Sequence, residues 1–290
     1  MNSLFSPIQP HTANPVTQWQ TIAFQGVPGA YAHIAAQQAA PHAQPLACPS
    51  FAEAVHLVES GQASGAILPV ENSTTGRIAD IHALLPQTSL HIVAEHFLPI
   101  SHCLMGLPGA EISQIRTVYS QLPAIQQCQN TLSSMGLAHE SYLDTAGSAK
   151  MVAERADPTL AALASSLAAT TYGLSILKSP MNDQANNTTR FLLLGPQGWN
   201  PPLTEPTKTT LLFRVKDIPA ALYKALGGFA TNGLNLSRLE SYLVGGDFQA
   251  AEFFIDIEGH PATAPMQNAL SELAHFTASI RLMGTYPANA

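Results

Sequence analysis

The sequence predicts an α/β protein of two lobes followed by a smaller α+β domain. Short apolar runs typical of buried strands alternate with helical segments as far as about residue 196. The pattern then changes to strand, helix, two strands around a turn, helix and strand, which is the ferredoxin-like order βαββαβ. With 290 residues, of which 46% are hydrophobic, the chain can form a sizeable core in each part.

The domain boundaries follow from these changes of pattern. We expect a disordered lead-in at residues 1–19, because this stretch is rich in Pro, Ser, Asn and Gln. The α/β domain is expected at 20–196, with its second lobe at about 99–177. A proline-rich linker at 197–207 separates it from the βαββαβ domain at 208–287.

Each part has its own run of expected elements. The first lobe is expected to have the order β-α-α-β-α-β, at residues 21–24, 30–40, 51–59, 65–70, 78–85 and 91–97. The second lobe is expected to have strands at 101–105, 117–120, 140–143 and 160–164, and helices at 123–135, 146–155 and 165–172. The tail is expected to have strands at 209–216, 235–244, 248–258 and 279–286, helices at 219–231 and 264–274, and a hairpin turn at 245–247. Two α/β lobes form a cleft of the kind that small ligands favour.

Composition argues against several classes of protein. Charged residues are sparse, at 11%, and the basic ones form no aromatic-basic face, so we expect no nucleic-acid partner. No run approaches the roughly 18 apolar residues that a membrane span needs. Residues 1–19 lack the features of a secretory signal, so a cytoplasmic protein is expected. Three dispersed cysteines without a CxxC pair, and histidines without HExxH spacing, predict no disulfide framework and no metal site.

The first candidate motif places polar residues at the entry to a buried strand. Asn187, Thr189 and Arg190 lie directly before or within an apolar run that ends at Gly195. A threonine hydroxyl can hold a proton-bearing oxygen, and an arginine can bind a carboxylate with two parallel hydrogen bonds. The same residues also suit a turn in which asparagine side chains cap the backbone.

Two further motifs follow buried strands of the first lobe. The loop from Gln25 to Tyr31 opens a helix, whose N–H groups attract a carboxylate or phosphate. It is not GxGxxG, and Pro28 removes one donor, so a dinucleotide is not expected. The stretch Glu71–Arg77 holds more polar residues than the capping of its helix by Ser73 or Thr74 requires. Both stretches also suit ordinary loops between a strand and a helix.

Hydroxyl groups are also expected at helix starts of the second lobe. Thr145 and Ser165 occupy these positions, where capping is the simpler explanation. The chain has no GxSxG nucleophile elbow and no Ser-His-Asp order. Hydroxyls, amides and helix N-termini around one cleft, with one arginine, suit binding of a small multi-carboxylate and stabilisation of shifting charge.

The order and spacing of these motifs resemble prephenate dehydratase. The resemblance rests on residues 22–31, 69–73 and 187–191, with support from 161–165 and 172–174. The tail resembles the amino-acid-binding ACT domain, so the similarity covers about residues 21–287. It implies a two-lobed, periplasmic-binding-protein-like catalytic domain followed by an ACT regulatory domain. It also implies a carbon–oxygen lyase that converts prephenate to phenylpyruvate, water and CO2 in L-phenylalanine biosynthesis, without a cofactor or metal.

The resemblance assigns roles to the motif residues. Thr189 would be essential, and we expect it to hydrogen-bond the leaving hydroxyl, because a threonine is a poor acid. Glu71, Asn72 and Ser73 would line the facing wall, with Glu71 as a proton source if burial favours its protonated form. Arg190 would bind a carboxylate or brace the loop. The other residues expected to bind substrate are Asn187, Phe191, Gly29, Ala30, Tyr31, Thr74, Thr145 and Ser165.

The chain departs from the family pattern at four places. Ala32 stands where a serine is usual, and Ser120–Pro123 replaces Ser-His-Pro-Gln, so no histidine is expected at that site. In the tail, Ala220–Leu222 replaces Gly-Ala-Leu, and Glu240–Leu243 replaces Glu-Ser-Arg-Pro. These tail motifs imply an L-phenylalanine effector site, whose pocket the changes would reshape. Its expected residues are Ala220, Ala221, Leu222, Asn235, Leu236, Glu240 and Ser241.

The sequence also bears on the assembly of the protein and leaves two alternative functions open. The resemblance implies a homodimer or homotetramer, because ACT domains commonly pair through their sheets. The same scaffold also suits arogenate, the amino analogue of prephenate. A non-catalytic two-lobed binding protein with an ACT sensor is the alternative from another class.

Overall fold

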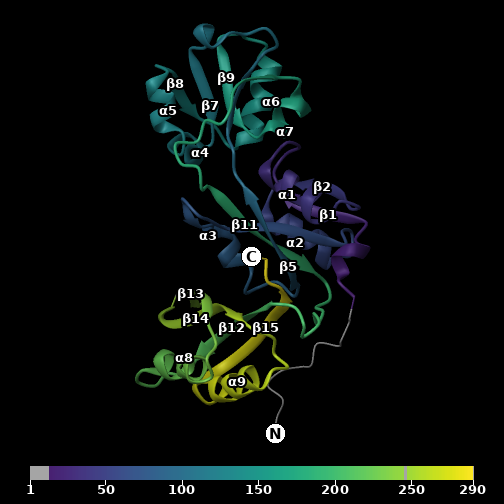
Figure 1. Cartoon of the computed structure of the whole chain (residues 1–290), viewed down its shortest axis with the longest axis vertical. Helices are drawn as coiled ribbons and strands as arrows, with labels where there is room; N and C mark the ends of the chain where they lie inside the picture. The colour runs from purple at the N-terminus through teal and green to yellow at the C-terminus, as the bar shows by residue number, and fades with distance from the viewer. Residues whose placement is uncertain (1–12, 245–246, 290) are drawn as a thin grey trace. The chain divides into compact units, whose positions relative to one another are not determined.

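The computed structural model describes residues 13–244 and 247–289 (Figure 1). These residues divide into two compact units, each described by itself. The two-lobed unit comprises residues 20–81 and 96–191, and the C-terminal unit comprises 13–19, 82–95 and those from 192 onward. Strands β5 (His91–Pro99) and β11 (Thr188–Gly195) each continue from one unit into the other.

Part of the expected disordered lead-in is ordered. Residues 1–12 lie outside the described part of the chain, but Pro15–Gln18 forms the 3-10 helix η1. The side chain of Asn14 caps this helix by accepting a hydrogen bond from the N–H of Val16. Val16 and Trp19 are buried, so the expectation of disorder is wrong here because two apolar side chains anchor the segment.

The first lobe is built on a sheet with the order β2-β1-β3-β11-β5. Strand β1 is parallel to both β2 and β3. Its elements are β1 (Thr21–Gln25), α1 (Tyr31–Ala39), β2 (Gln44–Cys48), α2 (Phe51–Glu59), β3 (Gly65–Asn72), β4 (Gly76–Arg77) and α3 (Ala79–Leu84). Strand β2 was not expected, because it is a short edge strand that contains Pro45 and has little apolar alternation.

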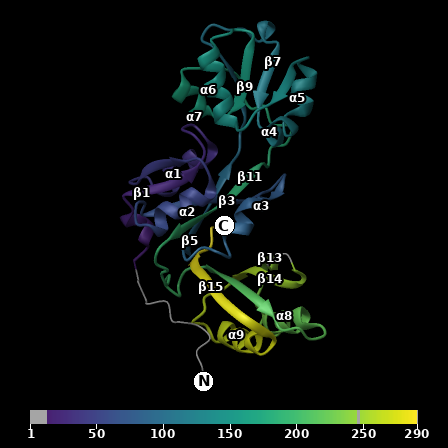
Figure 2. The same ribbon diagram turned by 180° about the vertical axis from the view of Figure 1, so that it is seen from behind.

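The second lobe is built on a sheet with the order β10-β6-β9-β7-β8. Its strands are β6 (Cys103–Gly106), β7 (Thr117–Ser120), β8 (Ala138–Ser141), β9 (Leu160–Ala164) and β10 (Ser175–Lys178), the last an unexpected edge strand. Its helices are η2 (Ile112–Gln114), α4 (Leu122–Gln126), α5 (Gln129–Ser134), α6 (Thr145–Arg155) and α7 (Ser166–Tyr172). Helices α6 and α7 cover one face of the sheet, and α4 and α5 cover the other (Figure 2).

The helix expected at 123–135 is two helices. Gln127 and Cys128 separate α4 from α5, and Cys128 has the non-helical angles φ −119° and ψ 11°. The carboxylate of Asp183 caps the second helix, since it accepts hydrogen bonds from the N–H groups of Asn130 and Thr131 at 2.8 and 2.9 Å. This break places Gln127 at a helix end and not in the middle of a helix.

The C-terminal unit contains the expected βαββαβ order. Its elements are β12 (Thr207–Val215), α8 (Ala221–Thr231), β13 (Leu236–Val244), β14 (Asp247–Glu258), α9 (Ala264–Phe276) and β15 (Thr277–Pro287). The sheet order is β13-β14-β12-β15, and α8 and α9 cover one face (Figure 1). Pro219 lies before α8 and not in its first turn, because Ala220 precedes the helix in a left-handed conformation. The expected turn includes residues 245–246, which lie outside the described residues.

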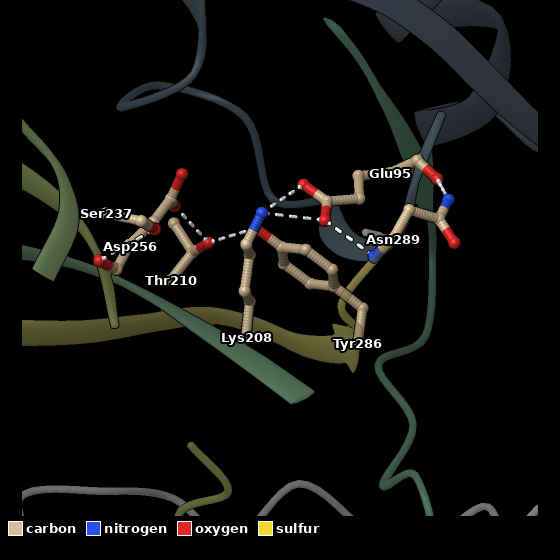
Figure 3. Close-up of polar contacts among 7 residues, drawn as sticks. All are labelled: Glu95, Lys208, Thr210, Ser237, Asp256, Tyr286 and Asn289. Carbon is tan, nitrogen blue, oxygen red and sulfur yellow. Dashed lines mark hydrogen bonds and ion pairs between the residues drawn. The ribbon is translucent and has the colours of Figure 1, made fainter. Parts of the chain in front are cut away.

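Residues 82–95 are held in this unit by a buried polar layer. Lys208 Nζ lies 2.8 Å from Glu95 Oε1, and the N–H of Asn289 donates to the same carboxylate at 3.0 Å (Figure 3). Arg281 donates to the backbone carbonyls of Pro86 and Thr88. These contacts fix the residues that precede and begin β5 within the C-terminal unit.

A second group of hydrogen bonds lies next to this ion pair and joins strands β12, β14 and β15. Thr210 Oγ1 donates to Asp256 Oδ1 at 2.6 Å, so the hydroxyl of Tyr286, at 2.8 Å, must donate to Thr210 (Figure 3).

The stretch 197–207, which was expected to be a linker, is also fixed in this unit. Its Trp199 is buried and donates from Nε1 to the carbonyl of Val93 at 2.8 Å.

The substitution Lys208→Met tests this polar layer. The Glu95 side chain has an exposed fraction of 0% and that of Lys208 13%, so the variant leaves a buried carboxylate without this cation. We expect the free energy of unfolding to fall by about 3 kcal/mol. Chemical denaturation measures the loss, and the double variant Glu95→Gln/Lys208→Met should recover part of it. Equal stability of Lys208→Met and the parent protein would contradict this account.

Candidate active site

Two of the polar motifs lie side by side at the end of β3 and the start of β11. The N–H of Ser73 donates to the carbonyl of Thr188 at 2.9 Å, and the N–H of Thr188 donates to Ser73 Oγ at 2.9 Å. Ser73 Oγ in turn donates to the carbonyl of Asn186 at 2.7 Å. The structure therefore brings together two segments that are more than a hundred residues apart in the chain.

The side chain of Asn72 organises the turn that follows β3. Its Oδ1 accepts from the N–H groups of Thr74 and Thr75, both at 3.0 Å, and from their two hydroxyls at 2.7 and 3.1 Å. Because a backbone N–H can only donate, the oxygen of the Asn72 amide must face the turn. The expectation that Ser73 or Thr74 caps a helix here is wrong, since β4 follows and Asn72 satisfies the turn.

The amide nitrogen of Asn72 consequently points at β11. It donates to Asn187 Oδ1 at 2.7 Å and to Thr189 Oγ1 at 3.0 Å. Thr189 is buried, with an exposed fraction of 8%. Since its oxygen accepts from Asn72, the hydroxyl hydrogen of Thr189 is left to donate to another acceptor.

Gln127 connects these residues to the second lobe. Its Oε1 accepts from Asn187 Nδ2 at 2.8 Å, and its Nε2 donates to Thr74 Oγ1 at 2.8 Å. The hydroxyl of Thr74 donates to Asn72 Oδ1, so the four side chains form a closed ring of hydrogen bonds. Every donor in this ring faces an acceptor, and the backbone N–H groups of Thr74 and Thr75 exclude the reversed arrangement.

A polar hollow of about 500 Å³ adjoins this ring. It has the size of a small-molecule site, and amides and hydroxyls dominate its wall. The lining residues are Thr74, Thr75, Gln126, Gln127, Asn130, Asn182, Asp183, Gln184 and Asn187. Sequence analysis identified only Thr74 and Asn187 among these as site residues. The polar run 182–187 before β11 was a signal for three more, whereas Gln127 is inconspicuous within an apparent helix.

The charge in this hollow belongs to Asp183. Burial alone would raise the pKa of its carboxyl, but hydrogen bonds from the N–H groups of Asn130 and Thr131 and from the Thr131 hydroxyl lower that pKa below its ordinary value. The carboxylate is therefore ionised and engaged with the start of α5. Burial raises the pKa of the Cys128 thiol to about 12, so this neighbouring cysteine is not a nucleophile.

A third predicted motif, the loop after β1, contacts helix α7 of the second lobe. Ser165 Oγ donates to the carbonyl of Gly29 at 2.6 Å, and Tyr172 OH donates to that of Pro28 at 2.7 Å. Gly29 has φ +89°, and a Cβ there would lie 2.8 Å from the Cα of Ala168. Ser165 also caps α7, so its hydroxyl serves two structural contacts.

Four of the expected residues lie elsewhere. Because successive side chains of a strand alternate, Glu71 lies on the face of β3 opposite to Asn72, and Arg190 on the face of β11 opposite to Thr189. Phe191 is 1% exposed, which places it in the core. Thr145 does not cap α6, because the carboxylate of Asp144 accepts from the N–H of Gly147 at 2.7 Å instead.

Tyr31 contacts a histidine that the motif comparison did not anticipate. Its hydroxyl lies 2.8 Å from His102 Nδ1 and 2.9 Å from the carbonyl of Ser101. His102 Nε2 lies 2.8 Å from Gln127 Oε1. This histidine comes from the crossover between the lobes and not from the motif at Ser120–Pro123, which contains none.

The expected effector residues form two groups in the C-terminal unit. Ala220 precedes α8 at φ +57°, with buried Ala221 and half-buried Leu222 after it. The other group belongs to β13, an edge of its sheet, or directly precedes it, and consists of Asn235, Leu236, Glu240 and Ser241.

Within the described residues there is no cluster of three or more His, Cys, Asp or Glu that could hold a metal ion. The helices of this described part are also too short or too polar to cross a membrane.

Comparison with known proteins identifies the family. A family model described as prephenate dehydratase matches residues 22–198, more than half of the chain. The chain belongs to the prephenate dehydratase family. The resemblance inferred from the sequence motifs is therefore confirmed at the level of the family, and the ring around Asn72 lies within the matched region.

Relatives extend this similarity over nearly the whole chain. A protein of Komagataeibacter europaeus named bifunctional N-acyl-homoserine lactone acylase/prephenate dehydratase is 45% identical, covering 92% of this chain and 96% of that protein. Arogenate dehydratase/prephenate dehydratase 1 of Arabidopsis thaliana is 38% identical, covering 92% and 71%. The solved structure of prephenate dehydratase in complex with L-Phe from Arthrobacter aurescens is 30% identical, with a TM-score of 0.84 and coverage of 93% and 92%.

The substitution Asp183→Ala tests the charge at the start of α5. It removes a capping acceptor, so we expect a loss of about 1 kcal/mol in the free energy of unfolding at neutral pH. The folded state lowers the pKa of Asp183, so its contribution is present above an unfolded pKa of about 3.9 and disappears as pH falls through the lower folded value.

Denaturation of both proteins between neutral and acidic pH checks this expectation. The difference in stability between them should shrink below about pH 4. Asp217→Ala, at an exposed position, is the matched control and should show no such trend. A constant difference at every pH would contradict an electrostatic cap.

Proposed function

We propose that this protein is a prephenate dehydratase, which converts prephenate to phenylpyruvate, water and CO2 in L-phenylalanine biosynthesis. One observation carries the proposal beyond family membership. The hydroxyl of Thr189 accepts from Asn72, which leaves its hydrogen to donate, and the ring that contains Asn72 borders a polar hollow of suitable size through Thr74, Gln127 and Asn187. The family match supports the same substrate class.

The proposed step moves one electron pair through the ring of the substrate. The bond between the ring and its carboxylate breaks, CO2 leaves, and the pair forms the new π bond of the aromatic ring. The carbon–oxygen bond to the ring hydroxyl breaks at the same time. The hydroxyl takes up a proton and leaves as water, so no net oxidant or reductant is consumed.

In this step Thr189 stabilises the charge that develops on the leaving oxygen. It donates a hydrogen bond to that oxygen, and its poor acidity means that the proton itself comes from another source. Asn72 is the positioning residue, because its amide fixes the direction in which Thr189 donates. Glu71, Ser73 and Arg190 would support the two strands, the first and last from the opposite face of the sheet.

Substitutions at Thr189 test the proposed role. Thr189→Val removes the hydroxyl at nearly constant volume, so kcat for prephenate should fall by on the order of 100-fold or more. Thr189→Ser keeps the donor and should retain most of the activity. The measurement is the rate of phenylpyruvate formation by the purified, folded variants.

The neighbouring Thr188→Val is the matched control, because Thr188 contacts Ser73 and Asn72 through its backbone. A Thr189→Val variant that keeps full activity would contradict the role of Thr189. Absence of turnover in the folded parent protein would instead favour a non-catalytic binding protein, whose ligand affinity should survive Thr189→Val.

Arogenate is a second candidate substrate. Proteins 36–39% identical to this one are named arogenate dehydratases, some with prephenate dehydratase in the same name. The ionised Asp183 in the hollow would favour an ammonium group over a keto group at the nearby end of the ligand. Values of kcat/KM for prephenate and arogenate, measured side by side with one enzyme preparation, decide which is preferred.

Amide hydrolysis of N-acyl-homoserine lactones is a second candidate activity. It is favoured by the relative named for both activities, which is 45% identical over almost its whole length. In this reaction water would add to the acyl carbon, the carbon–nitrogen bond would break, and the nitrogen would take the proton. Incubation with an N-acyl-homoserine lactone and detection of the free amine tests it, and Thr189→Val shows whether both activities share one site.

We also propose that L-phenylalanine regulates the enzyme at the C-terminal domain, in a homodimer or homotetramer. The support is the βαββαβ order and the relative solved with L-Phe. Ala220 lies at φ +57°, a conformation that costs an alanine more than a glycine. This position precedes α8, where the sequence motif predicts part of the effector site.

Ala220→Gly tests both the strain and the effector site. We expect the variant to gain up to about 1 kcal/mol in stability, because glycine adopts this conformation without steric cost. Thermal unfolding measures the gain, and calorimetry with L-phenylalanine measures affinity before and after the change. Ala225→Gly, in the middle of α8, is the control and should lose stability. Light scattering gives the assembly, and a monomer would contradict the proposed pairing.

A further inference from the structure

His102 is a buried histidine for which the proposed reaction gives no role. It is 3% exposed and follows the crossover that leads from β5 into the second lobe. Both ring nitrogens have partners at 2.8 Å, Tyr31 OH at Nδ1 and Gln127 Oε1 at Nε2. The ring of Tyr31 packs edge-on against it, with centroids 5.4 Å apart.

The backbone of His102 is fixed on both sides. Its N–H donates to Asn182 Oδ1 at 2.6 Å, and its carbonyl accepts from the N–H of Met181 at 2.8 Å. The segment that holds Asn182 also leads into the lining of the hollow. His102 therefore joins both crossovers between the lobes to the second-lobe residue Gln127.

The direction of each hydrogen bond at His102 follows from the turn after β3. The N–H groups at Thr74 and Thr75 fix the Asn72 amide, so Asn187 must accept with Oδ1 and donate with Nδ2. Gln127 Oε1 then accepts, and Gln127 Nε2 is committed to Thr74. Because Gln127 presents an oxygen to His102, the imidazole must carry its hydrogen on Nε2.

The other ring nitrogen faces Tyr31. A neutral imidazole with hydrogen on Nε2 has an acceptor at Nδ1, so the single hydrogen of the Tyr31 hydroxyl has two acceptors, His102 Nδ1 at 2.8 Å and the carbonyl of Ser101 at 2.9 Å. Burial lowers the pKa of His102, against a smaller opposing effect of the Gln127 hydrogen bond, and this favours the neutral ring. Burial also raises the pKa of Tyr31 well above its ordinary value, which keeps its hydrogen in place.

We propose that His102 is a positioning residue, whose Nε2–H holds Gln127 Oε1 in place and so keeps the ring that contains Asn72, the partner of Thr189, in one geometry. A reversed Gln127 would place its NH2 group against that of Asn187, and Asn187 cannot reverse because Asn72 is fixed by the backbone. The kinetic part of this proposal rests on the proposed dehydratase activity, but the tautomer does not.

The kinetic test compares two replacements of His102 that each keep one of its contacts. In His102→Gln the side-chain amide extends to the former position of Nε2, so its N–H can still donate to Gln127. In His102→Asn the shorter amide extends only to the former position of Nδ1, which faces Tyr31. We expect kcat to stay within about threefold for His102→Gln, the effect of one hydrogen bond of altered geometry. For His102→Asn, kcat should fall by on the order of 100-fold at little changed KM, because Gln127 loses its donor and the ring that holds Asn72 and Thr189 shifts from the productive geometry.

A matched control guards against a merely structural effect. His260 is also buried, and its Nδ1 accepts from the N–H of Ala262 at 3.0 Å in the C-terminal unit. His260→Asn should leave kcat unchanged. Thermal unfolding of all variants shows whether His102→Gln and His102→Asn are equally stable while they differ in kcat. Similar kcat values for these two variants would overturn the proposal.

The second test reads the tautomer directly and needs no activity. The side-chain nitrogens of ¹⁵N-histidine-labelled protein, with His102→Gln to assign the signal, should show His102 protonated at Nε2 and unprotonated at Nδ1. A His102 that is protonated at Nδ1 refutes the proposal even if the enzyme is active, and lack of prephenate turnover with the expected tautomer refutes the proposed function alone.

Discussion

The candidate site depends on the fact that a backbone N–H group can only donate a hydrogen bond. Two such groups, at Thr74 and Thr75, face the side chain of Asn72 and determine which end of its amide points to β11. An asparagine on its own has two orientations of nearly equal shape, and only its partners distinguish them. Once this choice is made, the donor and acceptor roles of Asn187 and Gln127 follow without further freedom. The turn therefore acts on Gln127 of the second lobe in two ways, through Asn72 and Asn187 and through the direct contact of Thr74.

The site residues that could be predicted from the sequence are those in short polar stretches next to a buried strand. A polar stretch directly after or before an apolar strand is visible in one dimension, and it identified Asn72, Thr74, Asn187 and Thr189, which the structure brings together. This criterion missed Gln127 and His102, because each is a single polar residue whose partners come from distant segments. It also grouped Glu71 with Asn72 and Arg190 with Thr189, although neighbours in a strand face opposite ways. The short edge strands β2 and β10 were missed because they bury too little to show a pattern.

The C-terminal unit contains a charged buried network, whereas the ring around Asn72 is neutral. Lys208 on β12 forms an ion pair with the buried carboxylate of Glu95 on β5, where an apolar pair of equal size would serve stability equally well. A charged pair tolerates far fewer arrangements than an apolar contact does. The carboxylate of Glu95 also accepts from the backbone N–H of Asn289, and the backbone carbonyl of Glu95 accepts from the Asn289 side chain. The ion pair and its contacts with Asn289 therefore hold β5 and the end of the chain together.

The two networks differ in a way that suits the proposed chemistry. The ring around Asn72 consists of neutral amides and hydroxyls, and His102 beside it is favoured as the neutral form by burial. Prephenate brings two carboxylates, and negative charge develops on its leaving oxygen. Thr189, held by this neutral network, donates a hydrogen bond to that charge without a counter-ion that would bind the ground state as strongly as the transition state. Preorganised dipoles thus serve this reaction better than a mobile cation beside Thr189 would.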